Sequence, residues 1–228
     1  MRDWMKNIPP GDLQNYGRGG FFSSMTPGKR AALVVVDVTM GFCGSPGLTL
    51  EQAIAQYPTA CGPSSWIAMP RIERLIGLFR RLDLPIVYSL ADLHDARWTG
   101  NATKSNASLR REGFNDFPDS IAPREQDWVL AKEKASAFFH TPLTIYLTRQ
   151  NVDTLVFCGV STSGCVRASV VDGFSNGYRT FVVDECCFDR SEFAHAANLF
   201  DMNAKYAAVI SLDEAIEMLG AQKRLAAE

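Results

Sequence analysis

The chain has 228 residues, of which 46% are hydrophobic and 21% are charged, and its formal net charge is −2. This composition is typical of a folded globular protein and is not that of a disordered chain. Because the net charge is small and no run of like charges occurs, the sequence offers no electrostatic basis for binding nucleic acid or an anionic membrane surface. Small neutral or mildly anionic substrates fit this composition better.

The sequence also predicts a cytoplasmic location. No segment approaches about 18 consecutive apolar residues, the length of a membrane-spanning helix, and residues 1–30 lack the apolar core of a signal peptide. The six cysteines are predicted to be reduced, because several fall in or beside predicted buried strands and do not suggest a small disulfide-rich domain.

The chain is expected to form an arm and one domain. Residues 1–30 are rich in Gly, Pro, Asn and Ser, which favours an extended arm wrapping the domain or a partner subunit, and residues 31–228 form the domain. The apolar run at 31–36 predicts a strand covered on both faces of a parallel sheet. Helical spacing and β-rich runs then alternate, which predicts helices over 70–82, 142–150, 165–176, 191–206 and 212–219, and strands over 84–90, 128–131, 154–158, 180–184 and 207–211.

This alternation predicts a three-layer α/β/α domain, doubly wound around a mostly parallel sheet. The polar stretch 91–127 is too long for a simple connection, so we expect it to carry function. In such sheets the ligand lies beyond the carboxyl ends of the strands. The polar residues that follow the predicted strands are Asp37, Asp92, His94, Lys132 and the segment 159–165, and we expect them to converge on one crevice.

Cys165 is the most informative of these residues. The segment 159–165 contains Gly and small hydroxyl residues and then opens a helix at Cys165, which places the sulfur at a helix N-terminus. Unpaired N–H groups and the helix dipole lower the pKa of a thiol there, so we expect a reactive thiolate. The same N–H groups can hold the oxyanion of a tetrahedral intermediate.

A cysteine nucleophile needs a proton acceptor, usually His. His195 falls in a late helix, and His94 and His140 have no evident pairing with Cys165. Asp37 can serve instead, because burial at the end of a strand raises the basicity of a carboxylate. The ammonium of Lys132 can orient Asp37, support the thiolate and offset negative charge in the transition state.

Three segments occur in a defined order: residues 31–37 (Ala-Ala-Leu-Val-Val-Val-Asp), 131–138 (Ala-Lys-Glu-Lys-Ala-Ser-Ala-Phe) and 158–167 (Cys-Gly-Val-Ser-Thr-Ser-Gly-Cys-Val-Arg). They resemble the catalytic segments of isochorismatase-like cysteine hydrolases, nearest to the N-carbamoylsarcosine amidase-like branch, in a resemblance that extends from about residue 31 to 219. The resemblance implies the isochorismatase-like fold, an Asp37-Lys132-Cys165 triad, a covalent acyl-enzyme and a cis peptide bond between Val160 and Ser161. It also implies an oxyanion hole at Ser161 and Cys165 and a homo-oligomer, a dimer or tetramer.

The same resemblance points to substrate-binding residues. The segment 180–190 resembles the stretch that follows the nucleophile helix in that branch, and Arg190 matches an arginine placed to hold a substrate carboxylate. Further candidates are Val160, Phe42, His94 and His140, the last standing where many relatives have a small residue. Asp92-Leu-His94 imitates half of the metal site of related nicotinamidases, but the other half is absent, and two ligands rarely suffice for a catalytic metal. We therefore predict neither a metal nor another cofactor.

The predicted activity is that of an amidohydrolase, an enzyme acting on carbon–nitrogen bonds of linear amides other than peptide bonds. It would release ammonia from a small N-carbamoyl compound, ureide or linear amide. Alternatives within the superfamily are a maleamate, biuret-type or nicotinamide substrate, and hydrolysis of an isochorismate-type vinyl ether, which the presence of Cys165 disfavours. A non-catalytic binding protein that uses the same pocket is the remaining alternative. The other five cysteines are expected to be inert core residues.

Overall fold

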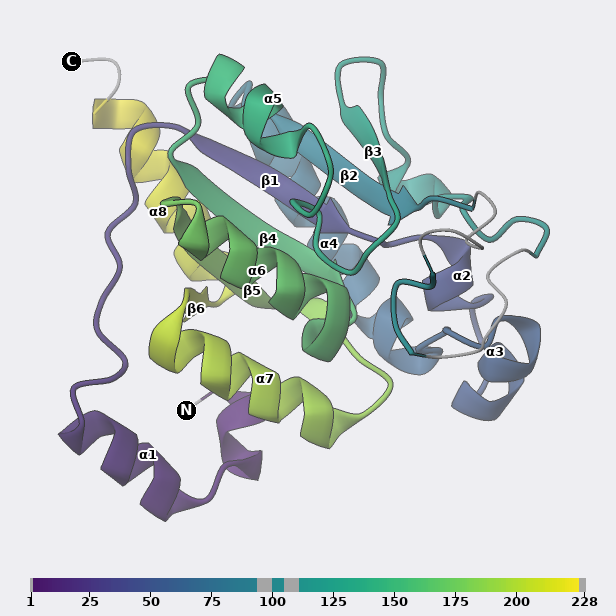
Figure 1. Cartoon of the computed structure of the whole chain (residues 1–228), viewed down its shortest axis with the longest axis horizontal. Coiled ribbons are helices and arrows are strands. Elements are labelled where there is room, and N and C mark those ends of the chain that lie inside the picture. Colours follow the sequence, from purple (N-terminus) through teal and green to yellow (C-terminus); the bar gives the residue numbers. More distant parts are fainter. Residues whose placement is uncertain (1, 94–99, 105–110, 226–228) are drawn as a thin grey trace.

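The structure, a computed structural model, describes residues 2–93, 100–104 and 111–225, and its centre is a six-stranded sheet (Figure 1). Every strand pair in it is parallel, which confirms the predicted α/β fold. The strand order is β3-β2-β1-β4-β5-β6, so the order reverses between β1 and β4. The strands are β1 (Ala31–Val36), β2 (Ile86–Ala91), β3 (Trp128–Lys132), β4 (Thr154–Val160), β5 (Arg179–Phe188) and β6 (Ala208–Ile210).

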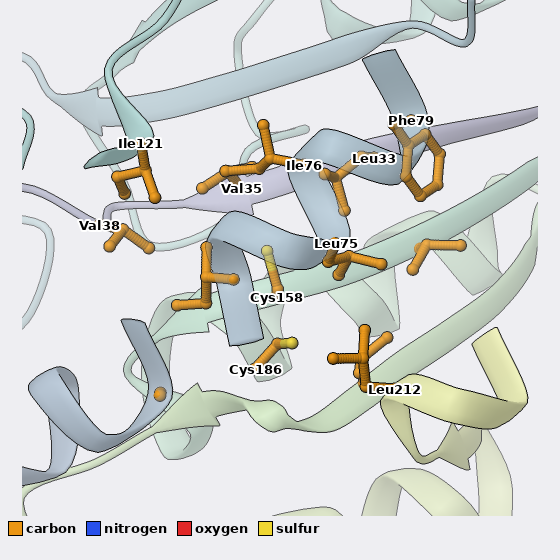
Figure 2. Packing of buried hydrophobic residues seen from close by; sticks show 14 of the residues in the cluster. Leu33, Val35, Val38, Leu75, Ile76, Phe79, Ile121, Cys158, Cys186 and Leu212 are labelled. Carbon is orange, nitrogen blue, oxygen red and sulfur yellow. The ribbon is translucent and has the colours of Figure 1, made fainter. Parts of the chain in front are cut away.

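Helices cover both faces of the sheet and make the three layers (Figure 1). On one face α4 (Pro63–Arg81) and α8 (Leu212–Leu225) cover an apolar core that contains Leu33 and Val35 of β1, part of which Figure 2 shows. On the other face α5 (Leu143–Arg149), α6 (Arg167–Ser175) and α7 (Glu192–Lys205) cover a second core, which contains Val34 and Val36. Successive side chains of a strand point to opposite faces, so the continuous apolar run of β1 fills both cores at once.

Several predicted boundaries differ from the structure, and two of the differences follow from packing and strand pairing. Helix α4 begins at Pro63, not at residue 70, and continues through Pro70, because Ala68 and Met69 bury its first turns and this packing outweighs the hydrogen bond that proline removes. Strand β5 continues to Phe188, beyond the predicted end at residue 184, because its ladder with β4 resumes after an irregularity and pairs Val160 with Phe188.

Short helices fill the connection between β1 and α4, for which no helix or strand was predicted. They are α2 (Met40–Cys43) and α3 (Leu50–Gln56), the second of which begins with a capping box formed by Thr49 and Gln52. A third apolar cluster lies here and joins this connection to the long polar stretch through Phe114, together with Ala53, Tyr57 and Ala60. Further along that stretch, residues Asp119–Ile121 form one turn of 3₁₀ helix.

The segment before β1 is extended only in part, whereas its composition suggested an extended arm over residues 1–30. It contains a 3₁₀ helix (Asp3–Asn7) and α1 (Pro10–Arg18), with proline at the first position of the helix, where its missing N–H costs nothing. Trp4 explains the folding of this segment, because its ring is buried beside α7 and its indole N–H donates to Asp184 Oδ2 at 3.1 Å. The domain boundary at residue 30 stays a prediction.

All six cysteines are buried and free, as predicted from their positions. None of the described helices is both long enough and apolar enough to cross a bilayer.

Candidate active site

Asp37 is the first residue after β1, and it is almost completely buried. Its backbone has φ 52°, in the left-handed region that Asp tolerates because its short polar side chain can bond locally. On the neighbouring strand β2, the Ser89 hydroxyl donates to Asp37 Oδ1 at 2.7 Å, and the Ser89 carbonyl accepts the Asp37 N–H at 3.1 Å. Ser89 therefore holds the backbone and one carboxylate oxygen of Asp37, which leaves Oδ2 to accept a hydrogen bond from another residue.

Lys132 is the partner of Asp37 Oδ2. It is the last residue of β3, which is separated from β1 by β2, and its side chain is only 3% exposed. Its Nζ donates to Asp37 Oδ2 at 2.8 Å and to the Lys134 carbonyl at 3.1 Å. Burial lowers the pKa of Lys132, but the charge of Asp37 and the contact with Cys165 more than offset it, so the pKa is raised. The ammonium therefore stays charged through the neutral pH range.

Cys165 lies in the segment 161–166, which we call the Cys165 turn. The turn follows β4, contains one π-helical turn (Thr162–Val166) and leads into α6. The N–H groups of Gly164 and Val166 both donate to the Ser161 carbonyl, at 2.9 and 3.2 Å. The thiol of Cys165 lies close enough to Asp37 and Lys132 for both side chains to shift its pKa. The three groups thus meet beside the point where the strand order reverses, where ligands bind in sheets of this kind.

The charge state of Cys165 differs from the expected thiolate. Burial, and after it the Asp37 carboxylate, raise the pKa of the Cys165 thiol to about 12, and the Lys132 ammonium offsets only part of this rise. A helix N-terminus lowers the pKa of a thiol, but the Cys165 thiol is also buried and lies near a carboxylate, and both raise its pKa. At neutral pH the resting site therefore holds a neutral thiol between a carboxylate and an ammonium, and the thiol must lose its proton as it attacks.

The peptide bond between Val160 and Ser161 is cis, as expected. Gly159, just before it, has φ +115°, and a Cβ at this position would lie 2.2 Å from the Val36 carbonyl oxygen. Only glycine lets β4 pass this close to the end of β1. The close approach sets the distance between Asp37, which follows β1, and the Cys165 turn, which follows β4. The assignment of the oxyanion hole to Ser161 and Cys165 stays a prediction.

Arg190 lies at the same edge of the sheet as the three groups, two residues beyond β5. Its side chain is exposed, and Nη2 donates to the Thr59 carbonyl at 2.5 Å, in the connection before α4. Among the residues that the structure describes, its guanidinium makes no hydrogen bond or ion pair with Asp37, Lys132 or Cys165. The structure therefore leaves Arg190 at the rim of the site.

The remaining predicted substrate-binding residues are scattered. Phe42 lies in α2, soon after Asp37, with its ring 5.4 Å from that of Phe114. The side chain of Val160 is fully buried in the core on the α4 face, so it packs inside the domain and does not line a crevice. His140 is exposed and stacked on Phe139 at 4.4 Å. His94 lies outside the described residues.

Asp92, which the sequence analysis placed in half of a metal site, follows β2 at the same edge of the sheet. Asp92 is exposed, and its N–H donates to the Lys132 carbonyl at 2.9 Å. Within residues 2–93, 100–104 and 111–225, no three His, Cys, Asp or Glu side chains come together as a metal site would require. The absence of a metal or other cofactor stays a prediction, because His94 is not among these residues.

Sequence reasoning missed four polar residues around the site. Ser89 is a hydroxyl residue inside an apolar strand, a signal that could have found it. Asp189 directly follows β5, which ends at Phe188. Because the strand was predicted to end at residue 184, Asp189 was not recognised as a polar residue that follows a strand. Thr162 and His195, whose side chains meet at 2.8 Å, lie 33 residues apart and gave no local signal.

Comparison with known proteins identifies relatives over most of the chain. Residues 31–214 match the isochorismatase domain family. Maleamate amidohydrolase from Pseudomonas putida is 33% identical over 198 residues, which cover 84% of this chain and 88% of that protein. N-carbamoylsarcosine amidase from Arthrobacter sp. is 27% identical over 216 residues, covering 90% and 77%. Among solved structures, a cysteine hydrolase from Pseudomonas syringae pv. phaseolicola is 19% identical, covers 88% of this chain and 99% of its own, and superposes with a TM-score of 0.73, a likeness of fold.

Proposed function

The chain belongs to the isochorismatase family, and from that premise we propose that it is a cysteine amidohydrolase that releases ammonia from a small amide or ureide. Relatives that span most of the chain carry the names of amidohydrolases, and these relatives support the reaction class. The substrate is a finer question, on which the two relatives differ.

One observation carries the proposal. A carboxylate and an ammonium, with side chains only 1% and 3% exposed and joined at 2.8 Å, lie near a buried cysteine thiol and shift its pKa. Burying an ion pair costs desolvation energy, and replacing such a pair by apolar side chains is often neutral or stabilising. A site that retains both charges beside a nucleophilic atom is better explained by chemistry than by stability.

The proposed reaction begins with the neutral thiol. As the sulfur of Cys165 attacks the carbonyl carbon, its proton moves to Asp37, and the carbonyl oxygen takes the negative charge, facing the N–H groups of Ser161 and Cys165. Lys132, still protonated, offsets this charge. The C–N bond then breaks, the proton on Asp37 passes to the leaving nitrogen, and ammonia departs from a thioester.

Water completes the cycle. Asp37 is again a carboxylate and takes a proton from the attacking water, and the C–S bond breaks as the acid forms. The proton held by Asp37 then returns to the sulfur, which restores the neutral thiol. An amide yields a carboxylic acid, and a ureide yields a carbamic acid. No histidine is required, because Asp37 accepts and donates every proton in turn.

The substrate class that we propose is a short amide or ureide that carries a carboxylate. Maleamate and N-carbamoylsarcosine, the compounds in the names of two relatives, share a terminal CO–NH₂ group and a carboxylate. Arg190 is the residue that we propose for the carboxylate, because it stands at the same sheet edge and guanidinium has five N–H donors, of which Thr59 occupies one.

Ammonia release over a panel of compounds tests the proposal. We expect turnover of maleamate, N-carbamoylsarcosine or a related carboxylated amide, with nicotinamide as a neutral comparison. Cys165→Ala should abolish turnover, and mass spectrometry of the wild type during turnover should find an acyl group on the Cys165 peptide. Ammonia release that persists in Cys165→Ala would refute the assignment of the nucleophile.

A further inference from the structure

We propose that His195 and Asp189 are positioning residues that hold the Cys165 turn, through Thr162 and Ser163, so that the thiol stays directed at Asp37 and Lys132. Neither residue belongs to the three groups described above, and neither was indicated by the sequence. The inference rests on the function proposed above, because positioning a thiol affects turnover only if that thiol reacts.

Thr162 links the Cys165 turn to α7. Thr162 is fully buried, and its hydroxyl lies 3.1 Å from the Phe188 carbonyl and 2.8 Å from His195 Nδ1. A carbonyl can only accept, and a hydroxyl has a single proton. Both contacts are therefore hydrogen bonds only if the hydroxyl donates to Phe188 and accepts from His195. This assigns the proton of the imidazole to Nδ1.

The charge of His195 agrees with this assignment. Burial lowers the pKa of His195, and the carboxylates of Asp189 and Glu192 raise it less, so the ring is neutral at neutral pH. A neutral imidazole carries one proton, and here that proton lies on the nitrogen that faces Thr162. In water the Nε2–H tautomer of histidine is the more stable one, so an Nδ1–H tautomer would mark this contact.

Ser163 links the Cys165 turn to Asp189, the residue after β5. Asp189 is 7% exposed, and its Oδ2 accepts the Ser163 N–H at 2.8 Å and the Ser163 hydroxyl at 2.7 Å. Its Oδ1 accepts the Arg190 N–H at 2.8 Å. Three donors thus compensate a buried carboxylate, and two of them come from the Cys165 turn.

These contacts act on the turn and not on the reacting atoms. Thr162 and Ser163 are three and two residues before Cys165, and both are tied to elements on the far side of the turn from Lys132. A displacement of about 1 Å from the reactive geometry can cost about 100-fold in rate. Held on one side by β5 and α7, the turn can present the sulfur to Asp37 and Lys132 in one arrangement.

The kinetic test compares two substitutions of His195. His195→Ala removes the donor, whereas His195→Asn places an amide N–H near the position of Nδ1. We expect His195→Ala to lower kcat about 10- to 100-fold with KM changed less than about threefold, and His195→Asn to recover most of the loss. Asn198→Ala, which removes a different hydrogen bond of α7, to the Ala194 carbonyl, is the matched control and should leave kcat within about twofold. Equal losses in the two His195 variants, or an unchanged kcat in His195→Ala, would overturn the proposal.

A partner substitution tests whether the loss passes through the turn. Thr162→Val keeps the shape of a fully buried side chain and removes the hydroxyl that His195 contacts. It should lower kcat as much as His195→Ala does, and the double variant should be no slower than either single variant. Multiplied losses in the double variant would mean that the two residues act independently, which contradicts the proposal.

A spectroscopic test is independent of activity and of any substrate. Nitrogen NMR of the ¹⁵N-histidine-labelled wild type should show a neutral Nδ1–H ring for His195, which can be assigned among the three histidines by substituting the other two. In Thr162→Val this ring should change to the Nε2–H form. An Nε2–H ring in the wild type overturns the proposal whatever the enzyme does. If no compound releases ammonia but the tautomer and its change are as expected, the proposed function fails while the contact stands.

Discussion

Replacing Asp37 by Asn is the sharpest test of the charge arrangement in the site. The substitution keeps the shape of the side chain and removes the negative charge that, after burial, contributes most to raising the pKa of Cys165 to about 12. It also leaves the buried ammonium of Lys132 without its carboxylate partner. A thiolate at Cys165 can then replace that partner, so the variant should hold more thiolate than the wild type although it cannot turn over substrate.

The magnitude of the effect can be estimated from Coulomb's law for two neighbouring charges. Two unit charges about 4 Å apart interact by about 4 kcal/mol at an effective dielectric constant near 20. Since about 1.4 kcal/mol is a factor of ten, complete removal of this repulsion would raise the thiolate population about 1000-fold. At rest the thiol is neutral, so its repulsion from Asp37 is weaker than that between two full charges. We therefore expect the thiolate population to increase by about 100- to 1000-fold near neutral pH.

The assay measures alkylation of Cys165 by iodoacetamide, with the modified peptide identified by mass spectrometry, and the ultraviolet absorbance of the thiolate. Asp37→Asn should alkylate much faster than the wild type, while its ammonia release should fall by about 100- to 10,000-fold through loss of the general base. Cys165→Ser is the control that shows how much alkylation occurs at the other five cysteines, all of them buried. Alkylation of Asp37→Asn at or below the wild-type rate would refute the reasoning.

Three further predictions concern the ion pair, the strand contact and the substrate. Lys132→Met leaves the buried charge of Asp37 unpaired, so urea unfolding should find the variant about 3–5 kcal/mol less stable, and adding Asp37→Asn should restore much of the loss; a stable single variant would contradict this. Gly159→Ala should cost roughly 3 kcal/mol or more, because its Cβ would overlap a carbonyl oxygen of β1, whereas the open position of Gly220 makes Gly220→Ala a control that should not destabilise. Arg190→Met should raise KM for a carboxylated amide about tenfold or more and leave a neutral amide unaffected; equal effects on both would remove Arg190 from the carboxylate site.

Much of the fold could be predicted because its signals are local. The apolar run of β1 identifies a strand buried on both faces, and the alternation of strands and helices identifies a parallel sheet. Parallel strands end at one edge, so Asp37 and Lys132 could be placed together without coordinates. Their contact at 2.8 Å agrees with that prediction, while their catalytic roles, the homo-oligomer and the cytoplasmic location stay predictions.

Other features could not be read from local sequence because distant residues decide them. The first residues of the chain are polar and rich in Gly and Pro, which suggested an extended arm, but Trp4 buries its ring beside α7 and residues 3–18 contain two short helices. Val160 was assigned to the substrate, yet the phase of β4 turns its side chain into the core on the α4 face. A strand's phase relative to its neighbours depends on the pairing of the sheet.

The sequence by itself determined that Asp37, Lys132 and Cys165 stand at one edge of the sheet, because residue type and position after a strand are local properties. Only the tertiary structure decided the state of those groups. The pKa of Cys165 is raised because burial and the Asp37 carboxylate outweigh the Lys132 ammonium, and each of these contributions depends on distances between elements far apart in the chain. The contact of His195 with Thr162 depends on the same packing, since α7 must fold back beside the Cys165 turn before the two side chains can meet.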